Sequence, residues 1–102
     1  MARYRLTPQA RTGFRNILEY VERDFGVRVA ERVLDRIESA FELLAESPGI
    51  GHSREDLTTD DRIQFWTVGP TLIAYRPGID IVEILIVERG ERDWERLLET
   101  EL

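Results

Sequence analysis

Hydrophobic residues recur with a helical period in the first half of the chain and in strand-like runs in the second half. From Pro8 to about Phe25 the apolar positions fall on one face of a helix, at Ala10, Phe14, Ile17, Leu18, Val21 and Phe25. Thr7 is a suitable N-cap for this helix, and Gly26 follows where a C-terminal glycine is common. A second segment, from about Val27 to Ala45, keeps the same period until proline ends it at Ser47–Gly49. Because so few residues separate the two segments, we expect a helical hairpin.

Three strands are predicted after a polar surface loop at Gly49–Asp61. The segments Arg62–Val68, Thr71–Arg76 and Asp80–Glu88 are rich in β-branched and aromatic residues and are separated by short turns that contain glycine and proline. Such spacing predicts an antiparallel meander. The last segment is almost entirely apolar, which indicates burial on both faces, as in a central strand.

A short strand at Arg3–Leu6 and a short helix from Trp94 to about Leu98 complete the predicted order, β-α-α-β-β-β-α. This order predicts an α+β fold in which the helical hairpin packs on one face of a small antiparallel sheet. The 102 residues are close to the common domain size, so we expect a single domain spanning residues 1–102.

Two neighbouring aromatic residues on the first meander strand must face opposite sides of the sheet. Phe65 and Trp66 are adjacent, and side chains alternate along a strand. One of them belongs to the core under the helices. The other would lie on the opposite sheet face, which could be covered by a partner protein or by the helix that begins at Trp94.

The charge balance argues against a nucleic-acid binder and favours a protein partner. The chain has 20 acidic and 14 basic residues, a net charge of −6, and every basic residue is an arginine. Proteins that bind nucleic acid usually carry a surplus of positive charge, so we expect no direct contact with nucleic acid. The chain has no signal-peptide pattern and no apolar run of membrane-spanning length, which predicts a cytoplasmic protein without membrane contact.

The chemistry of metal and thiol sites is poorly represented. The chain has no cysteine, and His52 is its only histidine. His52 is followed by Glu55 and Asp56, but one histidine with two acids falls short of the ligand set of a zinc site. We therefore expect neither a metal nor a cofactor.

Five segments in order carry a family resemblance, namely YRLTPQA, the set Tyr20, Phe25, Gly26 and Ala30, FELLAESPGIG, VGPTLIAYR, and VEILIVERGERD. Together they resemble the ParE toxins of type II toxin–antitoxin modules, within the wider RelE/ParE superfamily. The resemblance implies a toxin neutralised in a hetero-oligomer by a tightly bound, ParD-like antitoxin that wraps the helical hairpin and the sheet. It further implies inhibition of DNA gyrase by protein–protein contact, whereas RelE-like relatives cut messenger RNA on the ribosome.

The chain departs from the family pattern at polar positions. Gly13 stands where many members have an acidic residue, and Gln64 stands where many have arginine. In the last strand Ile86 replaces an arginine and Arg89 replaces a histidine. These differences leave open a third possibility, a ParE-fold protein that has lost toxicity and only binds a partner.

Arginines near the strand ends are the candidates for target contact. We expect Arg76, Arg89 and Arg92 to form one basic rim that pairs with an acidic group of the target, because arginine binds carboxylates in a bidentate way. The same charges could simply keep a strand end solvated. Trp94 is either an anchor in this interface or a cap on the core.

The antitoxin candidates are aromatic residues of the hairpin and the sheet, namely Tyr20, Phe41, Trp66 and Tyr75. A ribonuclease would instead have to use Arg76, Arg89, Arg92, Glu91 and Tyr75, with His52 in a distant loop. This set meets the need for a general acid and base poorly, so no catalytic residue is assigned.

Overall fold

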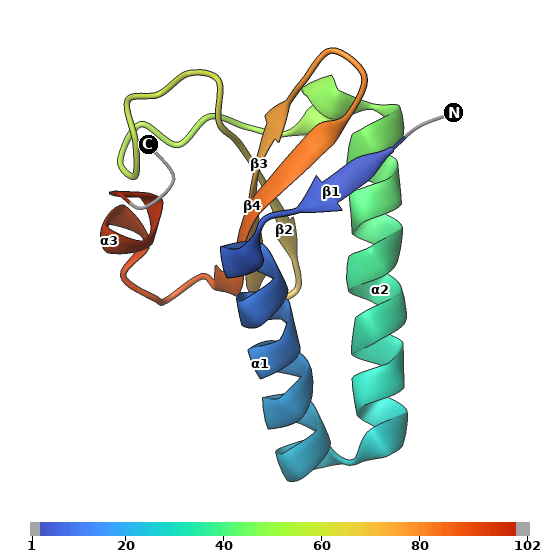
Figure 1. Ribbon diagram of the computed structural model, residues 1–102. Helices are drawn as coiled ribbons and strands as arrows, with labels where there is room; N and C mark the ends of the chain where they lie inside the picture. The colour runs from blue at the N-terminus through green and yellow to red at the C-terminus, as the bar shows by residue number, and fades with distance from the viewer. Residues whose placement is uncertain (1–2, 100–102) are drawn as a thin grey trace.

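A helical hairpin and a four-stranded sheet make up most of the molecule. A computed structural model describes residues 3–99. Helix α1 spans Pro8–Phe25 and helix α2 spans Val27–Glu46, which confirms the predicted hairpin (Figure 1). The Thr7 hydroxyl caps α1 by accepting a hydrogen bond from the Ala10 amide at 3.1 Å. Gly26 has a φ of 93°, which lets the chain reverse between the helices without a side-chain clash.

The sheet contains the predicted meander, with one further strand at its edge. Strands β2 (Gln64–Val68), β3 (Thr71–Pro77) and β4 (Val82–Arg89) pair antiparallel in sequence order. Strand β1 (Tyr4–Leu6) pairs parallel to β4, so the strand order is β1-β4-β3-β2 and β4 is central, as its apolar sequence predicts. A 3-10 turn at Pro48–Ile50 leads into the loop that precedes β2.

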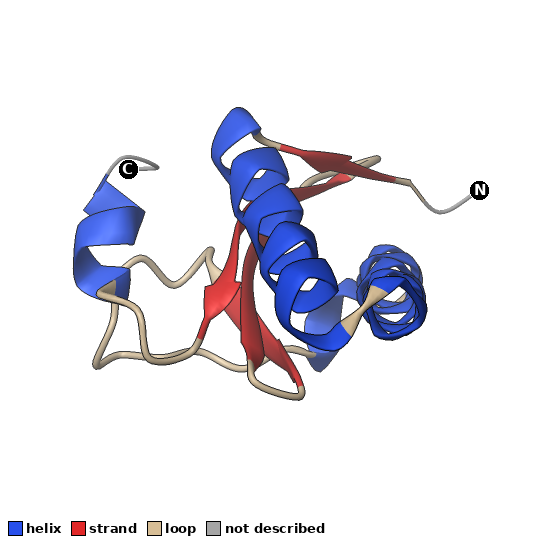
Figure 2. Cartoon of the chain, turned by 90° about the horizontal axis from the view of Figure 1, so that it is seen from below, coloured by secondary structure: helices blue, strands red, loops and turns tan. Residues whose placement is uncertain are grey.

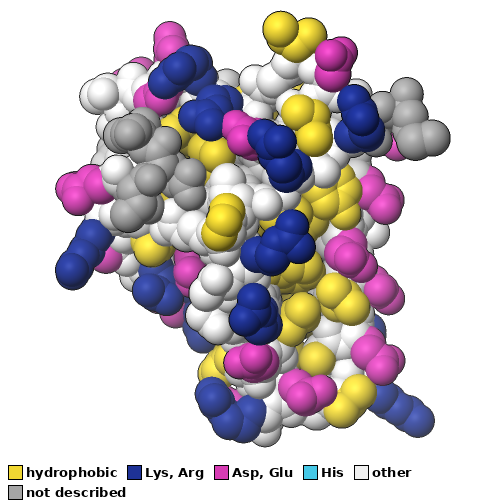
Figure 3. Space-filling model, in the orientation of Figure 1, with side chains coloured by type: hydrophobic (Ala, Val, Ile, Leu, Met, Phe, Trp, Pro, Cys, Tyr) yellow, Lys and Arg dark blue, Asp and Glu magenta, His cyan; other side chains and the backbone are white. Residues whose placement is uncertain are grey.

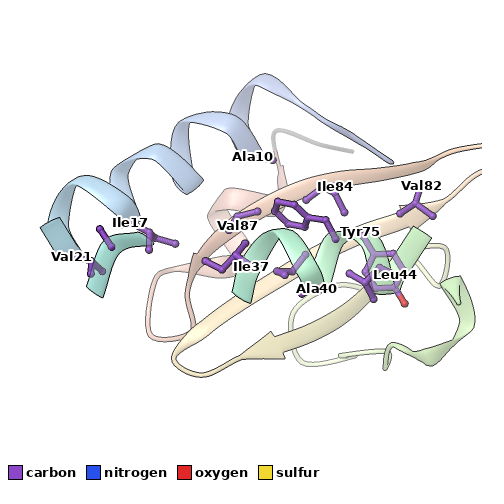
Figure 4. Packing of buried hydrophobic residues seen from close by; sticks show 13 residues of the cluster. Ala10, Ile17, Val21, Ile37, Ala40, Leu44, Tyr75, Val82, Ile84 and Val87 are labelled. Carbon is purple, nitrogen blue, oxygen red and sulfur yellow. The ribbon is translucent and has the colours of Figure 1, made fainter. Parts of the chain in front are cut away.

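The helical hairpin covers one face of the sheet and forms the larger core with it (Figure 2). Hydrophobic side chains also gather on the surface between the two helices, with charged side chains around them (Figure 3). Ile37 and Leu44 of α2 pack toward Tyr75, Ile84 and Val87 of the sheet (Figure 4). At the crossing of α1 and β4, a Cβ on Gly13 would overlap the carbonyl oxygen of Val87. Glycine is therefore what allows α1 to approach the backbone of the central strand so closely.

A second core lies on the other face of the sheet, under helix α3 (Trp94–Glu99). Phe65 is only 2% exposed there and meets the Trp94 ring edge-to-face, with ring centroids 6.2 Å apart. The Trp94 indole donates a hydrogen bond to the Arg89 carbonyl at 2.9 Å. Of the two predicted coverings for this face, the chain's own C-terminal helix is the correct one, and Trp94 caps the core.

Trp66 consequently lies on the hairpin side of the sheet. It is partly buried against the larger core and stacks on the His52 ring, with centroids 6.2 Å apart. Within residues 3–99 no helix is both long and apolar enough to cross a bilayer.

Candidate partner-binding groove

A cavity of about 470 Å³ opens between the closed end of the hairpin and the end of β4, and we call it the groove. Its apolar lining comes mainly from the two helices, at Ile17, Tyr20, Val21, Phe25, Val29 and Val33. The closed end of the hairpin extends beyond the sheet (Figure 1). The inner sides of both helices therefore lack a covering strand there, which leaves apolar side chains open to solvent.

Phe25 is the clearest sign that the groove is an incomplete core. Its side chain is 61% exposed although it lies on the apolar face of α1. It meets the Tyr20 ring edge-to-face at 6.2 Å, so the two rings form one aromatic surface. A partner that covered Phe25 would gain the free energy of burying a large apolar side chain, about 1.5–3 kcal/mol.

The wall formed by the end of β4 is charged. The Arg89 guanidinium lies over the Tyr20 ring, 5.4 Å from its centroid, and Arg89 Nε is 2.8 Å from a Glu91 carboxylate oxygen. Arg92 Nη1, in the turn after β4, donates to Glu88 Oε1 at 3.1 Å. Glu88 is only 9% exposed, and the arginine supplies the partner that a buried carboxylate needs.

Arg76 does not join this wall, so the predicted single rim is wrong. Arg76 donates to Glu83 at 2.6 Å, and Arg5 donates to the same carboxylate at 2.8 Å. These three residues stand side by side across β3, β4 and β1. Because Glu83 and Arg89 are six residues apart on one strand, Arg76 lies roughly 20 Å from the groove wall. Its hydrogen bond, followed by that of Arg5, holds the pKa of Glu83 below its usual value.

Two of the four predicted antitoxin contacts are buried in the core. Phe41 is 1% exposed and Tyr75 is fully buried. The Tyr75 hydroxyl donates to the Pro48 carbonyl at 2.7 Å and accepts from the Gly51 amide at 2.9 Å, and burial raises its pKa. Tyr75 thus joins the sheet to the turn after α2, and neither Tyr75 nor Phe41 presents a surface to a partner in the free chain. Tyr20 lines the groove, and Trp66 is half-buried near the edge of the sheet.

The residues that a ribonuclease would need are not brought together. The Tyr75 hydroxyl is used inside the core, and Arg76 lies at the opposite end of β4 from Arg92. In the part of the chain that the structure describes, no three histidine, cysteine or acidic side chains are grouped as metal ligands. His52 instead contacts Trp66 and pairs its backbone with Phe65.

The groove itself was not predicted, although a signal for it exists in the sequence. Helices of 18 and 20 residues are about 27–30 Å long, whereas strands of five to eight residues span about 17–26 Å. The hairpin must therefore project beyond the sheet. This overhang exposes Phe25, next to the Gly26 corner, and it leaves Val29 and Val33 only partly buried.

The fold has a counterpart among solved structures. A chain of a structure titled "Chromosomal ParDE TA system from P. aeruginosa" superposes with a TM-score of 0.73, covering 89% of this chain and 98% of that one at 18% identity. This similarity places the hairpin-on-sheet architecture in a known class of small α+β proteins.

Sequence comparison then gives the family. The family model for the ParE toxin of type II toxin–antitoxin systems, parDE, matches residues 4–94. Toxin ParE1 of Caulobacter vibrioides is 30% identical over 90 residues, which cover 88% of this chain and 92% of that protein. Toxin ParE3 of the same organism is 36% identical over 76 residues, or 74% and 70% of the two chains. The chain belongs to the ParE toxin family, as the five resembling segments imply.

Proposed function

We propose that this chain is the toxin of a toxin–antitoxin pair, that a ParD-like antitoxin neutralises it in a hetero-oligomer, and that it inhibits DNA gyrase by protein–protein contact. It acts as a binding protein and not as an enzyme, and gyrase as a target places its action in the cytoplasm. The observation that carries the proposal is an open apolar groove, rimmed by arginine, in a member of the ParE family.

The groove has the properties of a surface that a permanent partner covers. Phe25 is largely exposed and Tyr20 partly so, and aromatic residues are the usual anchors of protein interfaces. Trp66 provides a second aromatic contact near the sheet edge. We assign antitoxin binding to Phe25, Tyr20 and Trp66.

Arg89 and Arg92 form the part of the predicted rim that remains available for the target. Both line the groove, so an antitoxin bound there would cover them. Neutralisation then follows from occlusion of the target-binding surface. Ile86, which replaces an arginine in the family pattern, is fully buried under α3, where a charged side chain would lose its hydration.

Induced expression of the chain, with and without a co-expressed ParD-like antitoxin, tests the proposal. Growth arrest with double-strand DNA breaks, relieved by the antitoxin, is the expected result. Growth arrest with cleaved messenger RNA and intact DNA would refute gyrase inhibition and support ribonuclease action. No arrest at all would leave only a binding function.

A matched pair of variants tests the groove within the same assay. Phe25→Asp places a charge in the groove, and Ile79→Asp makes the same change at a fully exposed hydrophobic residue in the β3–β4 turn. The antitoxin should fail to rescue cells that express Phe25→Asp and should still rescue those that express Ile79→Asp. Equal rescue of both would remove the groove from the antitoxin interface.

A further inference from the structure

Three arginines stand in a row on the exposed surface of helix α2. Arg28, Arg32 and Arg36 recur every four residues, so successive positions lie about 6 Å apart along the helix axis, and we call the three the arginine row. All three are exposed, and the next position at the same spacing is Ala40, so no acidic residue follows in the series. Acidic side chains of α2 gather on the face that Figure 3 shows. They come from a neighbouring strip of the helix, at Glu31, Asp35, Glu38 and Glu42.

No carboxylate of the described chain pairs with the arginine row. Among residues 3–99, seven other arginines have a carboxylate oxygen within 4.0 Å, namely Arg5, Arg23, Arg54, Arg62, Arg76, Arg89 and Arg92. Over the same residues the structure gives Arg28, Arg32 and Arg36 no ion pair and no side-chain hydrogen bond. Like charges four residues apart destabilise a helix, and no ion pair offsets that effect here. An uncompensated local conflict of this kind is typical of a binding surface.

The arginine row differs from the groove in the kind of partner that it fits. The groove is lined mainly by apolar side chains, and the interfaces of permanent complexes are the more hydrophobic ones. The row consists of charged side chains on the outer surface of one helix. Charges at such a surface raise the rate and the specificity of association more than the affinity. We therefore expect a permanent partner in the groove and a transient partner at the row.

A protein that fills the groove would also lie beside the arginine row. Val29 and Val33 line the groove on its α2 side, and they directly follow Arg28 and Arg32 in the sequence. A permanent partner in the groove would thus keep a second, large protein away from the row. This arrangement lets one surface carry the toxic contact while occupation of the other surface prevents it.

We propose that the arginine row binds an acidic surface of the target, one that presents successive carboxylates about 6 Å apart. The inference rests on the proposed function, in which the target is DNA gyrase, and it adds a contact outside the groove to that of Arg89 and Arg92. An acidic helix with Asp or Glu at every fourth residue has the required spacing. Nucleic acid is also regularly charged, but the acidic strip of α2 beside the row would repel an extended phosphate backbone.

Charge reversal at the centre of the row gives a variant that should keep the fold. Arg32→Glu places an acid four residues from both Arg28 and Arg36, which replaces two repulsions within α2 by two attractions. Its Tm should therefore be no lower than that of the unaltered chain, and a lower Tm would contradict the view that the row destabilises α2. Arg11→Glu is the matched control. It makes the same change of charge at an exposed arginine of α1 without an ion pair in residues 3–99, and it places an acid four residues before Arg15.

Supercoiling by purified gyrase, measured at increasing concentrations of each protein, tests the contact. Arg32→Glu should raise the concentration needed for half-inhibition at least about tenfold at about 0.05 M salt, and the difference should shrink at about 0.3 M salt. Arg11→Glu should inhibit as well as the unaltered chain does. Equal inhibition by all three proteins, or an equal loss in both variants, would overturn the inference.

Expression of the same variants in cells identifies the partner of the row. Arg32→Glu should cause weaker growth arrest and should still be co-purified with a co-expressed ParD-like antitoxin. Full arrest that the antitoxin no longer relieves would assign the row to the antitoxin and refute the inference. Binding of the unaltered chain to a DNA duplex without gyrase, lost in Arg32→Glu, would assign the row to nucleic acid and refute it as well.

An NMR titration separates failure of this inference from failure of the proposed function. The probe is a helical peptide of about 18 residues with glutamate at every fourth position and alanine or glutamine elsewhere. It should shift the Nε–H signals of the arginine row and leave those of Arg11 and Arg15 in place, whereas a peptide with lysine for glutamate should shift neither set. If the unaltered chain does not inhibit gyrase, the proposed function fails and this titration decides the inference. Selective shifts at the row support it, and absent or unselective shifts refute it.

Discussion

Replacing Gly13 by alanine should destabilise the protein although alanine is the better helix former. An added Cβ would overlap the Val87 carbonyl oxygen and would stand 2.8 Å from a Glu88 carboxylate oxygen. Glycine-to-alanine changes in a helix interior normally gain about 1 kcal/mol. Overpacking against a core costs about 1–3 kcal/mol, and here the cost should be in the upper part of that range, about 2–3 kcal/mol, because a backbone carbonyl in a central strand shifts less readily than a side chain. The net expectation is a loss of about 1–2 kcal/mol, which corresponds to a fall in Tm of roughly 5–15 °C.

Urea denaturation, monitored by circular dichroism, gives the free energy of unfolding. An unchanged m value would show that the loss of stability does not come from a change in the unfolded state. Gly49→Ala is the matched control, because no atom lies within 4 Å of a Cβ added there. It should be neutral or stabilising by up to about 1 kcal/mol. Adding Glu88→Gln to Gly13→Ala should not restore stability, since the Val87 carbonyl remains. A Gly13→Ala protein as stable as the parent would refute the argument that close approach of α1 to β4 requires glycine.

Three further substitutions test other parts of the structure. Tyr75→Phe leaves the Pro48 carbonyl and the Gly51 amide without their partner, so the free energy of unfolding should fall by about 1–3 kcal/mol. An unchanged midpoint of urea denaturation would contradict this expectation. Glu83 has a lowered pKa, so its stabilising contribution is present above the ordinary glutamate pKa and is lost as pH falls through the folded-state value. Glu83→Gln should therefore lower stability at neutral pH and flatten the decline of Tm on acidification, and parallel Tm–pH curves would contradict the pairing. Trp94→Ala should lower the free energy of unfolding by about 3–5 kcal/mol. Trp94→Phe should lower it distinctly less, because phenylalanine loses only the indole hydrogen bond to Arg89 and keeps most of the packing on Phe65. Equal losses of stability in thermal unfolding would contradict the role of Trp94 as a core cap.

The elements of the fold follow from local patterns. The helical period, the Thr7 cap and the Gly26 corner each depend only on residues that are close in the sequence, so the hairpin could be predicted without tertiary information. The same holds for the meander, whose strands are separated by turns of a few residues. The almost entirely apolar sequence of β4 predicts a central strand, and this is confirmed.

The candidate site depended on contacts that join distant parts of the chain. In the sequence, Arg76 and Arg89 are both arginines near a strand end. The register of three strands places both Arg76 and Arg5 beside Glu83, where each forms an ion pair with its carboxylate. Strand alternation placed Phe65 and Trp66 on opposite faces, yet it could not say which face α3 would cover, because that choice depends on how the chain folds back after β4.

The sequence by itself determined the elements, their order and the family, since these depend on local periodicity and on residues in a fixed succession. The tertiary structure decided which side chains remain available to a partner. Phe25 and Ile17 both lie on the apolar face of α1, but the closed end of the hairpin extends beyond the sheet (Figure 1). Ile17 is therefore buried, whereas Phe25, the last residue of α1, is exposed. The element lengths already require an overhang, but which side chains it exposes depends on how the helices are placed on the sheet, and no local pattern encodes that placement.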